Sequence, residues 1–266
     1  LPKHAARLVR FLTALVVWSA VYYLWNTYYM GTFYDLKEIL YVPTEAHLWY
    51  LYAMIPIYLV LPFFQVMCRH MSLKLEKVFL IVTTGGVLFN YVLDLMGGQA
   101  YYALPLVGDR VYSWYVFAGY YLYKYRKHIR LSQRSLLVIC LLSMAGTFGI
   151  TLGITAASGR DCEKMLTYIS PLVAVAAVGF FLFMLRFKGG YIRLGERAKK
   201  IIDLFCGCSF GIYLIHILFL DNFKKHVEPY DLSAWIAVPG LIVVIAFVSF
   251  ACVWIIRKVP GGKKIT

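Results

Sequence analysis

The chain has 266 residues, of which 61% are hydrophobic and only 15% are charged, and its net charge is +14. A soluble globular domain carries about a quarter charged residues, so the composition excludes that class and predicts an integral membrane protein. The length predicts a single domain over residues 1–266. The positive charge does not indicate a nucleic-acid partner, because the cytoplasmic loops of membrane proteins collect Lys and Arg.

Apolar stretches separated by charged loops predict an all-α fold, a polytopic bundle of about eight transmembrane helices. The second stretch contains Pro56 and Pro62, which a membrane helix tolerates better than a soluble one. The fourth is short and rich in Tyr and Trp. In chain order the stretches cover residues 8–30, 47–67, 76–97, 111–124, 134–156, 165–185, 202–220 and 232–256.

The loops between these stretches differ in charge. Alternate loops hold 21 and 6 of the 27 Lys and Arg residues. The positive-inside rule then predicts that the richer set and both termini are cytoplasmic, which an even number of spans allows. We expect a multi-pass protein of the cell (cytoplasmic) membrane, surrounded by membrane lipids.

Two arginines, Arg7 and Arg10, lie on one face at the start of the first span. Their guanidinium groups match phosphate oxygens and would suit a nucleotide-like donor that arrives from the cytosol. Ordinary positive flanking of a membrane span explains them equally well.

A histidine opens the second span. His47 follows Glu45 and precedes Trp49 and Tyr50, at the predicted outer face. An imidazole in an outward-facing pocket suits proton transfer near neutral pH, with Glu45 to orient it. The alternative is an interfacial position, because aromatic belts form at the same depth.

The seventh span carries a polar stripe. Cys206, Ser209, Tyr213 and His216 are separated by three, four and three residues and share one helical face. Ionisable groups within a span indicate function, although polar contacts between helices are the alternative. Ser209 and His216 are about 10 Å apart along a helix, which argues against a serine nucleophile paired with that histidine. Asp94, near the outer end of the third span, is a further candidate for the same cavity.

The cysteines do not predict a metal site. Cys206 and Cys208 form a close pair, but no second pair and no adjacent His/Cys cluster accompanies them. We expect no metal cofactor.

Four segments resemble the acyltransferase-3 family of membrane-bound bacterial O-acyltransferases, and their order and spacing match over nearly the whole chain. They are Arg7-Leu-Val-Arg10, His47-Leu-Trp-Tyr-Leu-Tyr, Ser209-Phe-Gly-Ile-Tyr-Leu-Ile-His216 and Arg257-Lys-Val-Pro260.

This resemblance implies an enzyme that moves an acyl group, most often acetyl, from cytosolic acyl-CoA (acetyl-CoA) to a hydroxyl of a cell-surface glycan or lipid-linked sugar. It implies that Arg7 and Arg10 contact acyl-CoA and that His47 and His216 lie in the pocket. Acyl transfer needs a base and donors for the oxyanion, so we expect His47 and His216 to handle protons and Tyr213 to act as a donor, and these three form the predicted catalytic set. We expect the substrate pocket to include Trp49, Tyr50, Glu45, Asp94 and Ser209.

The chain also departs from the family pattern. Family members usually have ten spans, and the first carries a basic residue and a histidine thought central to acyl transfer. This chain resembles the family from the third span onward, so we expect a fragment without the first two spans. The rival hypothesis is a transporter or exporter of a saccharide or small metabolite without covalent chemistry, although the sequence has no clear internal repeat of the kind transporters show.

Overall fold

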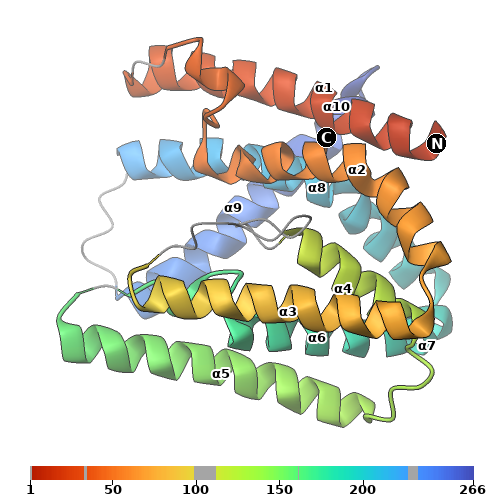
Figure 1. Ribbon diagram of the computed structural model, residues 1–266. Coiled ribbons are helices and arrows are strands. Elements are labelled where there is room, and N and C mark those ends of the chain that lie inside the picture. The colour runs from red at the N-terminus through yellow and green to blue at the C-terminus, as the bar shows by residue number, and fades with distance from the viewer. Residues whose placement is uncertain (1, 33–34, 99–111, 161, 227–232) are drawn as a thin grey trace. The chain divides into compact units, whose positions relative to one another are not determined.

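The computed structural model describes the chain except for residues 1, 33–34, 99–111, 161 and 227–232 (Figure 1). Every regular element in the described part is helical. The α-helices are α1 (Pro2–Leu24), α2 (Trp49–His70), α3 (Leu73–Leu95), α4 (Tyr112–Lys124), α5 (Gln133–Ser158), α6 (Pro171–Arg186), α7 (Lys188–Arg193), α8 (Glu196–His226), α9 (Ala234–Ile256) and α10 (Gly262–Ile265). Shorter elements are the π-helix η1 (Trp25–Met30) and the 3₁₀ helices η2 (Glu38–Leu40), η3 (Ala46–Leu48) and η4 (Lys164–Leu166).

Seven helical segments in the described residues are long and apolar enough to cross a membrane. The prediction of an all-α, polytopic bundle is therefore confirmed. The predicted fourth span corresponds to α4, whose 13 residues extend about 20 Å and fall short of a bilayer of about 30 Å. The residues before α4 lie outside the described part of the chain. The cytoplasmic location of both termini stays a prediction.

Local sequence sets where several helices begin and end. The hydroxyl of Ser132 caps α5 by accepting from the Ser135 amide at 3.0 Å, and Ser72 caps α3 in the same way. Gly31 ends η1 with φ 73°, a conformation that favours glycine. The two prolines of α2 lie within a continuous helix.

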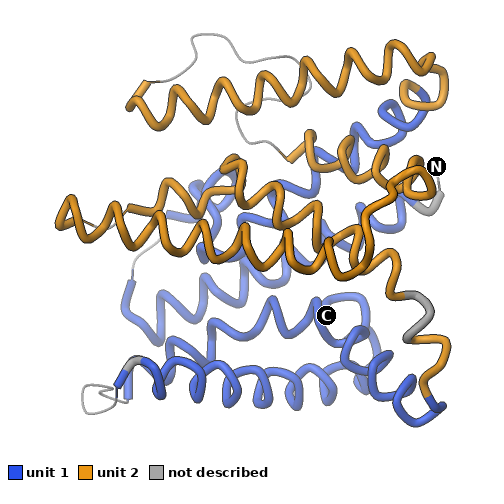
Figure 2. The backbone as a smooth tube through the Cα atoms, turned by 90° about the horizontal axis from the view of Figure 1, so that it is seen from below, with its two compact units in different colours: residues 1–66, 195–266 blue, residues 67–194 orange. Residues whose placement is uncertain are grey.

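The helices gather into two compact units, coloured separately in Figure 2. Unit 1 comprises residues 1–66 and 195–266, and unit 2 comprises residues 67–194. Unit 1 thus combines the first helices of the chain with the last ones. The expectation of a single domain stays a prediction.

The core of unit 1 joins α1, the start of α2, α8 and α9. Tyr22, Leu51 and Leu214 are each 0% exposed there. At Gly211 a Cβ atom would lie 2.6 Å from Cγ1 of Val253, so the missing side chain permits the close approach of α8 and α9.

Unit 2 is held by helix packing and by polar ties between its helices. A Cβ atom at Gly179 of α6 would lie 3.3 Å from the Leu136 carbonyl oxygen of α5, which marks a tight contact. The carboxylate of Glu76 in α3 is buried and accepts from Lys124 at the end of α4. Trp114 Nε1 of α4 donates to Thr84 Oγ1 of α3 at 3.0 Å.

Candidate active site

The predicted catalytic residues meet in unit 1. His47 lies in η3, and its ring packs edge-on against Tyr22 of α1 at 5.1 Å between centroids. The same ring packs against Tyr213 at 5.5 Å and His216 at 5.2 Å, both in α8. We call His47, His216, Tyr22 and Tyr213 the imidazole cluster. Three separate parts of the chain therefore converge on two histidines.

Backbone carbonyls fix the tautomer of each imidazole. His216 Nδ1 lies 2.7 Å from the Tyr213 carbonyl oxygen, and His47 Nε2 lies 3.3 Å from the Leu214 carbonyl oxygen. A carbonyl oxygen only accepts, so each of these ring nitrogens carries the hydrogen. The lone pairs of the neutral rings are then on Nε2 of His216 and Nδ1 of His47. His47 Nδ1 is buried and has no hydrogen-bond partner among the described residues.

The two tyrosines of the imidazole cluster hold the backbone around the histidines. The Tyr213 hydroxyl donates to the carbonyl oxygen of His47. The Tyr22 hydroxyl donates to the Leu214 carbonyl oxygen at 2.8 Å, the same carbonyl that His47 contacts. The geometry gives both hydroxyls a positioning role toward His47.

Glu45 is tied to α1. Asn26 Nδ2, in the π-helix, donates to Glu45 Oε1 at 2.7 Å and to the Thr44 carbonyl oxygen at 3.1 Å. Partial burial raises the pKa of Glu45, and the hydrogen bond from Asn26 offsets part of this rise. A π-turn inside a membrane helix often marks a functional site, and here it brings Asn26 to the segment that leads into His47.

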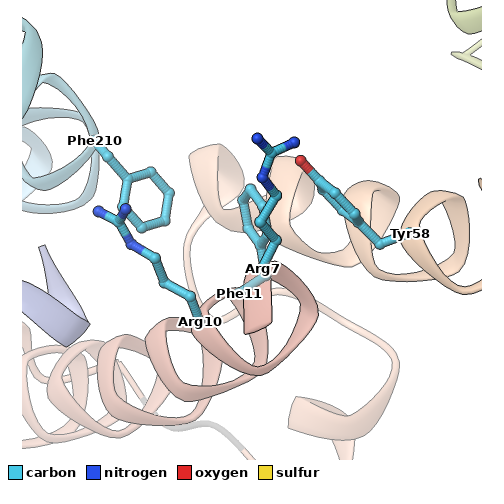
Figure 3. Close-up of a pocket in the computed structure, with 5 residues that line it drawn as sticks. All are labelled: Arg7, Arg10, Phe11, Tyr58 and Phe210. Carbon is cyan, nitrogen blue, oxygen red and sulfur yellow. The ribbon is translucent and has the colours of Figure 1, made fainter. Parts of the chain in front are cut away.

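The two arginines line a cavity of about 260 Å³ together with Phe11, Tyr58 and Phe210. Figure 3 shows Arg7 beside Tyr58 and Arg10 directed toward Phe210. The Arg10 guanidinium lies 5.2 Å from the centre of the Phe210 ring and donates to the Thr266 carbonyl oxygen at 2.8 Å. The cavity thus combines cationic and aromatic groups.

Aromatic rings connect this cavity to the imidazole cluster. The Phe11 ring packs against Tyr50 at 6.3 Å, and Tyr50 packs against Tyr213 at 5.8 Å. Along α1, the 12 residues from Arg10 to Tyr22 correspond to about 18 Å of helix rise. The arginines of α1 therefore lie about three turns along this helix from Tyr22 of the imidazole cluster, with aromatic side chains in between.

The other predicted pocket residues occupy different places. Trp49 packs edge-on against Tyr50 at 6.1 Å, so both belong to the surroundings of this aromatic path. Ser209 is exposed, and its hydroxyl donates to the Cys206 carbonyl oxygen at 2.9 Å, within its own helix. Asp94 lies in unit 2, where its carbonyl oxygen accepts from Lys164 at 2.7 Å.

Sequence reasoning missed several residues of the site, namely Phe11, Tyr22, Asn26, Tyr58 and Phe210. A signal for two of them was present, because Tyr22 and Asn26 continue the helical i, i+4 series of Ala14 and Trp18, and the structure buries all four side chains. Asn26 is the polar member of this stripe. No group of three or more His, Cys, Asp or Glu side chains able to hold a metal ion occurs among the described residues.

Seven apolar helices among the described residues, together with a histidine pair and an arginine-lined cavity, are typical of a multi-pass membrane protein with a candidate site. The chain matches the acyltransferase-3 family, described as "Acyltransferase domain", over residues 2–258, and it belongs to that family. It is therefore a membrane acyltransferase by family. The resemblance stated from the four sequence segments is confirmed. Comparisons with curated proteins and with solved structures give no significant match.

Proposed function

We propose that the protein transfers an acyl group, most often acetyl, from acyl-CoA to a hydroxyl of a glycan or lipid-linked sugar. The observation that carries this proposal is the pair of imidazoles 5.2 Å apart, each with one nitrogen held by a backbone carbonyl. Fixed tautomers leave a lone pair on each ring, as a general base requires. The family supports acyl transfer in general, and the donor and acceptor are our inference.

The chemistry follows from these lone pairs. Nε2 of His216 removes the proton of the acceptor hydroxyl as its oxygen attacks the thioester carbonyl carbon. The new carbon–oxygen bond gives a tetrahedral oxyanion, whose collapse breaks the carbon–sulfur bond. The thiolate of CoA leaves and takes up the proton from the imidazolium. His47 packs against His216 and supplies a second neutral imidazole beside the reacting groups.

The position of the arginines suits acyl-CoA as the donor. Its phosphates would bind the guanidinium groups of Arg7 and Arg10, which form bidentate contacts with phosphate. The flexible pantetheine arm separates these phosphates from the thioester. The aromatic path through Phe11 and Tyr50 offers this arm an apolar surface toward the histidines.

Binding of acetyl-CoA to the purified chain in detergent tests the donor site. We expect the Arg7→Ala/Arg10→Ala variant to lose at least about tenfold in affinity, because charge-assisted contacts to phosphate are lost. Higher salt should weaken wild-type binding. The matched control is Arg69→Ala/Arg134→Ala, which removes the same charge from two exposed positions in unit 2.

The conservative variant Arg7→Lys/Arg10→Lys separates folding from binding. It keeps both charges and should retain intermediate affinity, since a lysine cannot form the bidentate contact. Equal affinity of wild type, the alanine pair and the control pair would overturn the donor site. Transfer itself is read as ester formed on glycan in membranes supplied with isotope-labelled acetyl-CoA, and absence of label would overturn the proposed reaction.

A further inference from the structure

One end of unit 2 collects basic side chains that the proposed reaction does not use. The turn between α4 and α5 carries the exposed residues Lys127 and Arg130. Arg186 Nη2, in the last turn of α6, donates to the Ile129 carbonyl oxygen of this turn at 2.6 Å. The hydrogen bond places the turn against the end of α6. We call this turn, together with residues 184–193, the α6–α7 junction.

Few acids are available to balance the positive charge at the junction: Glu196, three residues after Arg193, already accepts from Lys199 at 3.0 Å. Glu76 lies at the same end of unit 2, but its carboxylate already accepts from Lys124 and Tyr125. Two further acids of unit 2 in the described part, Asp94 and Glu163, lie at the opposite helix ends. The exposed arginines of the junction therefore present a net positive surface.

An apolar cavity is formed by the same part of the chain. It has a volume of about 450 Å³ and is lined by Met184, Phe187, Tyr191 and Ile192 from the end of α6 and from α7. Arg186 lies within the segment that carries these lining residues, and Arg193 directly follows it in the sequence. Three of the lining residues, Met184, Phe187 and Ile192, are 46%, 51% and 71% exposed. Basic side chains in and next to a segment that lines an open apolar cavity are complementary to an amphiphile with an anionic head.

We propose that the α6–α7 junction binds an anionic phospholipid, with its phosphate against Arg130 and Arg193 and one acyl chain in the cavity lined by Met184, Phe187, Tyr191 and Ile192. Basic pockets beside transmembrane helices bind anionic headgroups in this way. The inference is independent of the proposed acyl transfer, since the arginines of that site lie in unit 1.

The apolar cavity decides between a lipid and a soluble phosphate compound. A nucleotide or inorganic phosphate would use the arginines and leave the cavity without a ligand. A phospholipid uses both features, because its phosphate binds the arginines and its acyl chain fills the cavity. The acyl chain then continues along the apolar surface of α6, which belongs to a candidate membrane span. The predicted cytoplasmic side of these loops also faces the leaflet in which anionic lipids attract basic segments.

Native mass spectrometry of the purified chain tests this site by titration with phosphatidylglycerol and, separately, with phosphatidylcholine of the same acyl chains. We expect phosphatidylglycerol to bind more tightly by roughly tenfold. The Arg130→Gln/Arg193→Gln variant should lose most of this preference. The matched control Lys74→Gln/Lys77→Gln removes the same charge from exposed positions at the same end of unit 2 and should keep it.

A second variant tests the cavity. Ile192→Asp places a charge in the apolar lining and should weaken binding of both lipids, whereas the arginine pair should affect only the anionic one. An equal loss of the preference for phosphatidylglycerol in the arginine variant and the lysine variant would overturn a defined site and indicate diffuse electrostatic attraction. Full competition by glycerol 3-phosphate would overturn a role for the cavity. A thermal melt of each variant confirms that it is folded during the titration.

Discussion

Two polar pairs of unit 2 contrast with the two histidines of unit 1. In unit 2, Glu76 pairs with Lys124 and Trp114 with Thr84, each across two helices. In unit 1 the backbone holds one side of each imidazole, and the other side keeps its lone pair. A group whose partners are complete contributes to stability, whereas one that is oriented but incompletely bonded is available for chemistry. The role of a polar residue in an apolar helix therefore depends on whether all of its hydrogen-bonding atoms have partners.

The largest expected effect tests whether unit 1 carries the chemistry. His216→Gln should reduce acyl transfer by at least about 100-fold, because a general base contributes roughly that factor or more. The control is His128→Gln, which changes an exposed histidine in unit 2 and should leave transfer unchanged. Ester formed per mole of folded protein is the measurement. Similar activity in the two variants would remove His216 from the mechanism.

The second prediction tests whether unit 2 carries stability. Lys124→Met leaves the buried carboxylate of Glu76 without its cation and should lower the melting temperature by several degrees. The Glu76→Gln/Lys124→Met variant has no buried charge at this position and should regain much of the loss. Acetyl-CoA binding well below the melting temperature should be the same in all three proteins. Equal melting temperatures for the single and double variants would contradict this role of the ion pair.

The third prediction compares one tyrosine-to-carbonyl hydrogen bond in each unit. Tyr213→Phe removes the bond to the His47 carbonyl and should lower transfer about fivefold, since such a bond contributes about 1 kcal/mol. Tyr115→Phe removes a tyrosine-to-carbonyl bond at Tyr168 in unit 2. It should give a comparable small loss of thermal stability with unchanged transfer. A loss of transfer in Tyr115→Phe alone would reverse the comparison.

The smallest expected effect concerns pH. Burial raises the pKa of Glu45, so the folded protein binds this proton more tightly than the unfolded chain does. The resulting stabilisation is complete below the ordinary pKa of a glutamate, about 4.3, and is lost as pH rises through the higher pKa of the folded state. Glu45→Gln keeps an acceptor for Asn26 and does not titrate. Its melting temperature relative to wild type should therefore rise between pH 4 and pH 7, and a difference independent of pH would contradict the assignment.

Hydropathy was sufficient to predict most of the fold. Long apolar stretches correspond to seven candidate spans, because burial in lipid demands the same residues along the whole helix. The fourth stretch was harder to bound, since its apolar run is short and α4 has only 13 residues. The division into two units was not visible in the sequence. It depends on which helices pack together, and hydropathy does not encode partners.

Only part of the site was predicted, because a sequence motif does not show which helices pack against it. His47, Tyr213 and His216 stand in motifs with defined spacing, and the structure brings them together. Asp94 has the same polar character but lies in the other unit. Tyr22 comes from a helix distant in sequence, and a local pattern does not specify the helix against which a residue packs. The roles of all these residues in catalysis stay predictions.

Unit 1 is built from two segments that are far apart in the sequence, and this has a consequence for its biosynthesis. Its first part leaves the ribosome well before residues 195–266, since all of unit 2 is translated in between. During that interval Tyr22 and His47 lack the α8 carbonyl with which they form hydrogen bonds in the finished fold. Asn26 has its partners Thr44 and Glu45 already, because they follow within the same part of the chain. The hydrogen bonds of Asn26 can therefore join the first two spans early. The contact between His47 and His216 forms only when α8 is inserted.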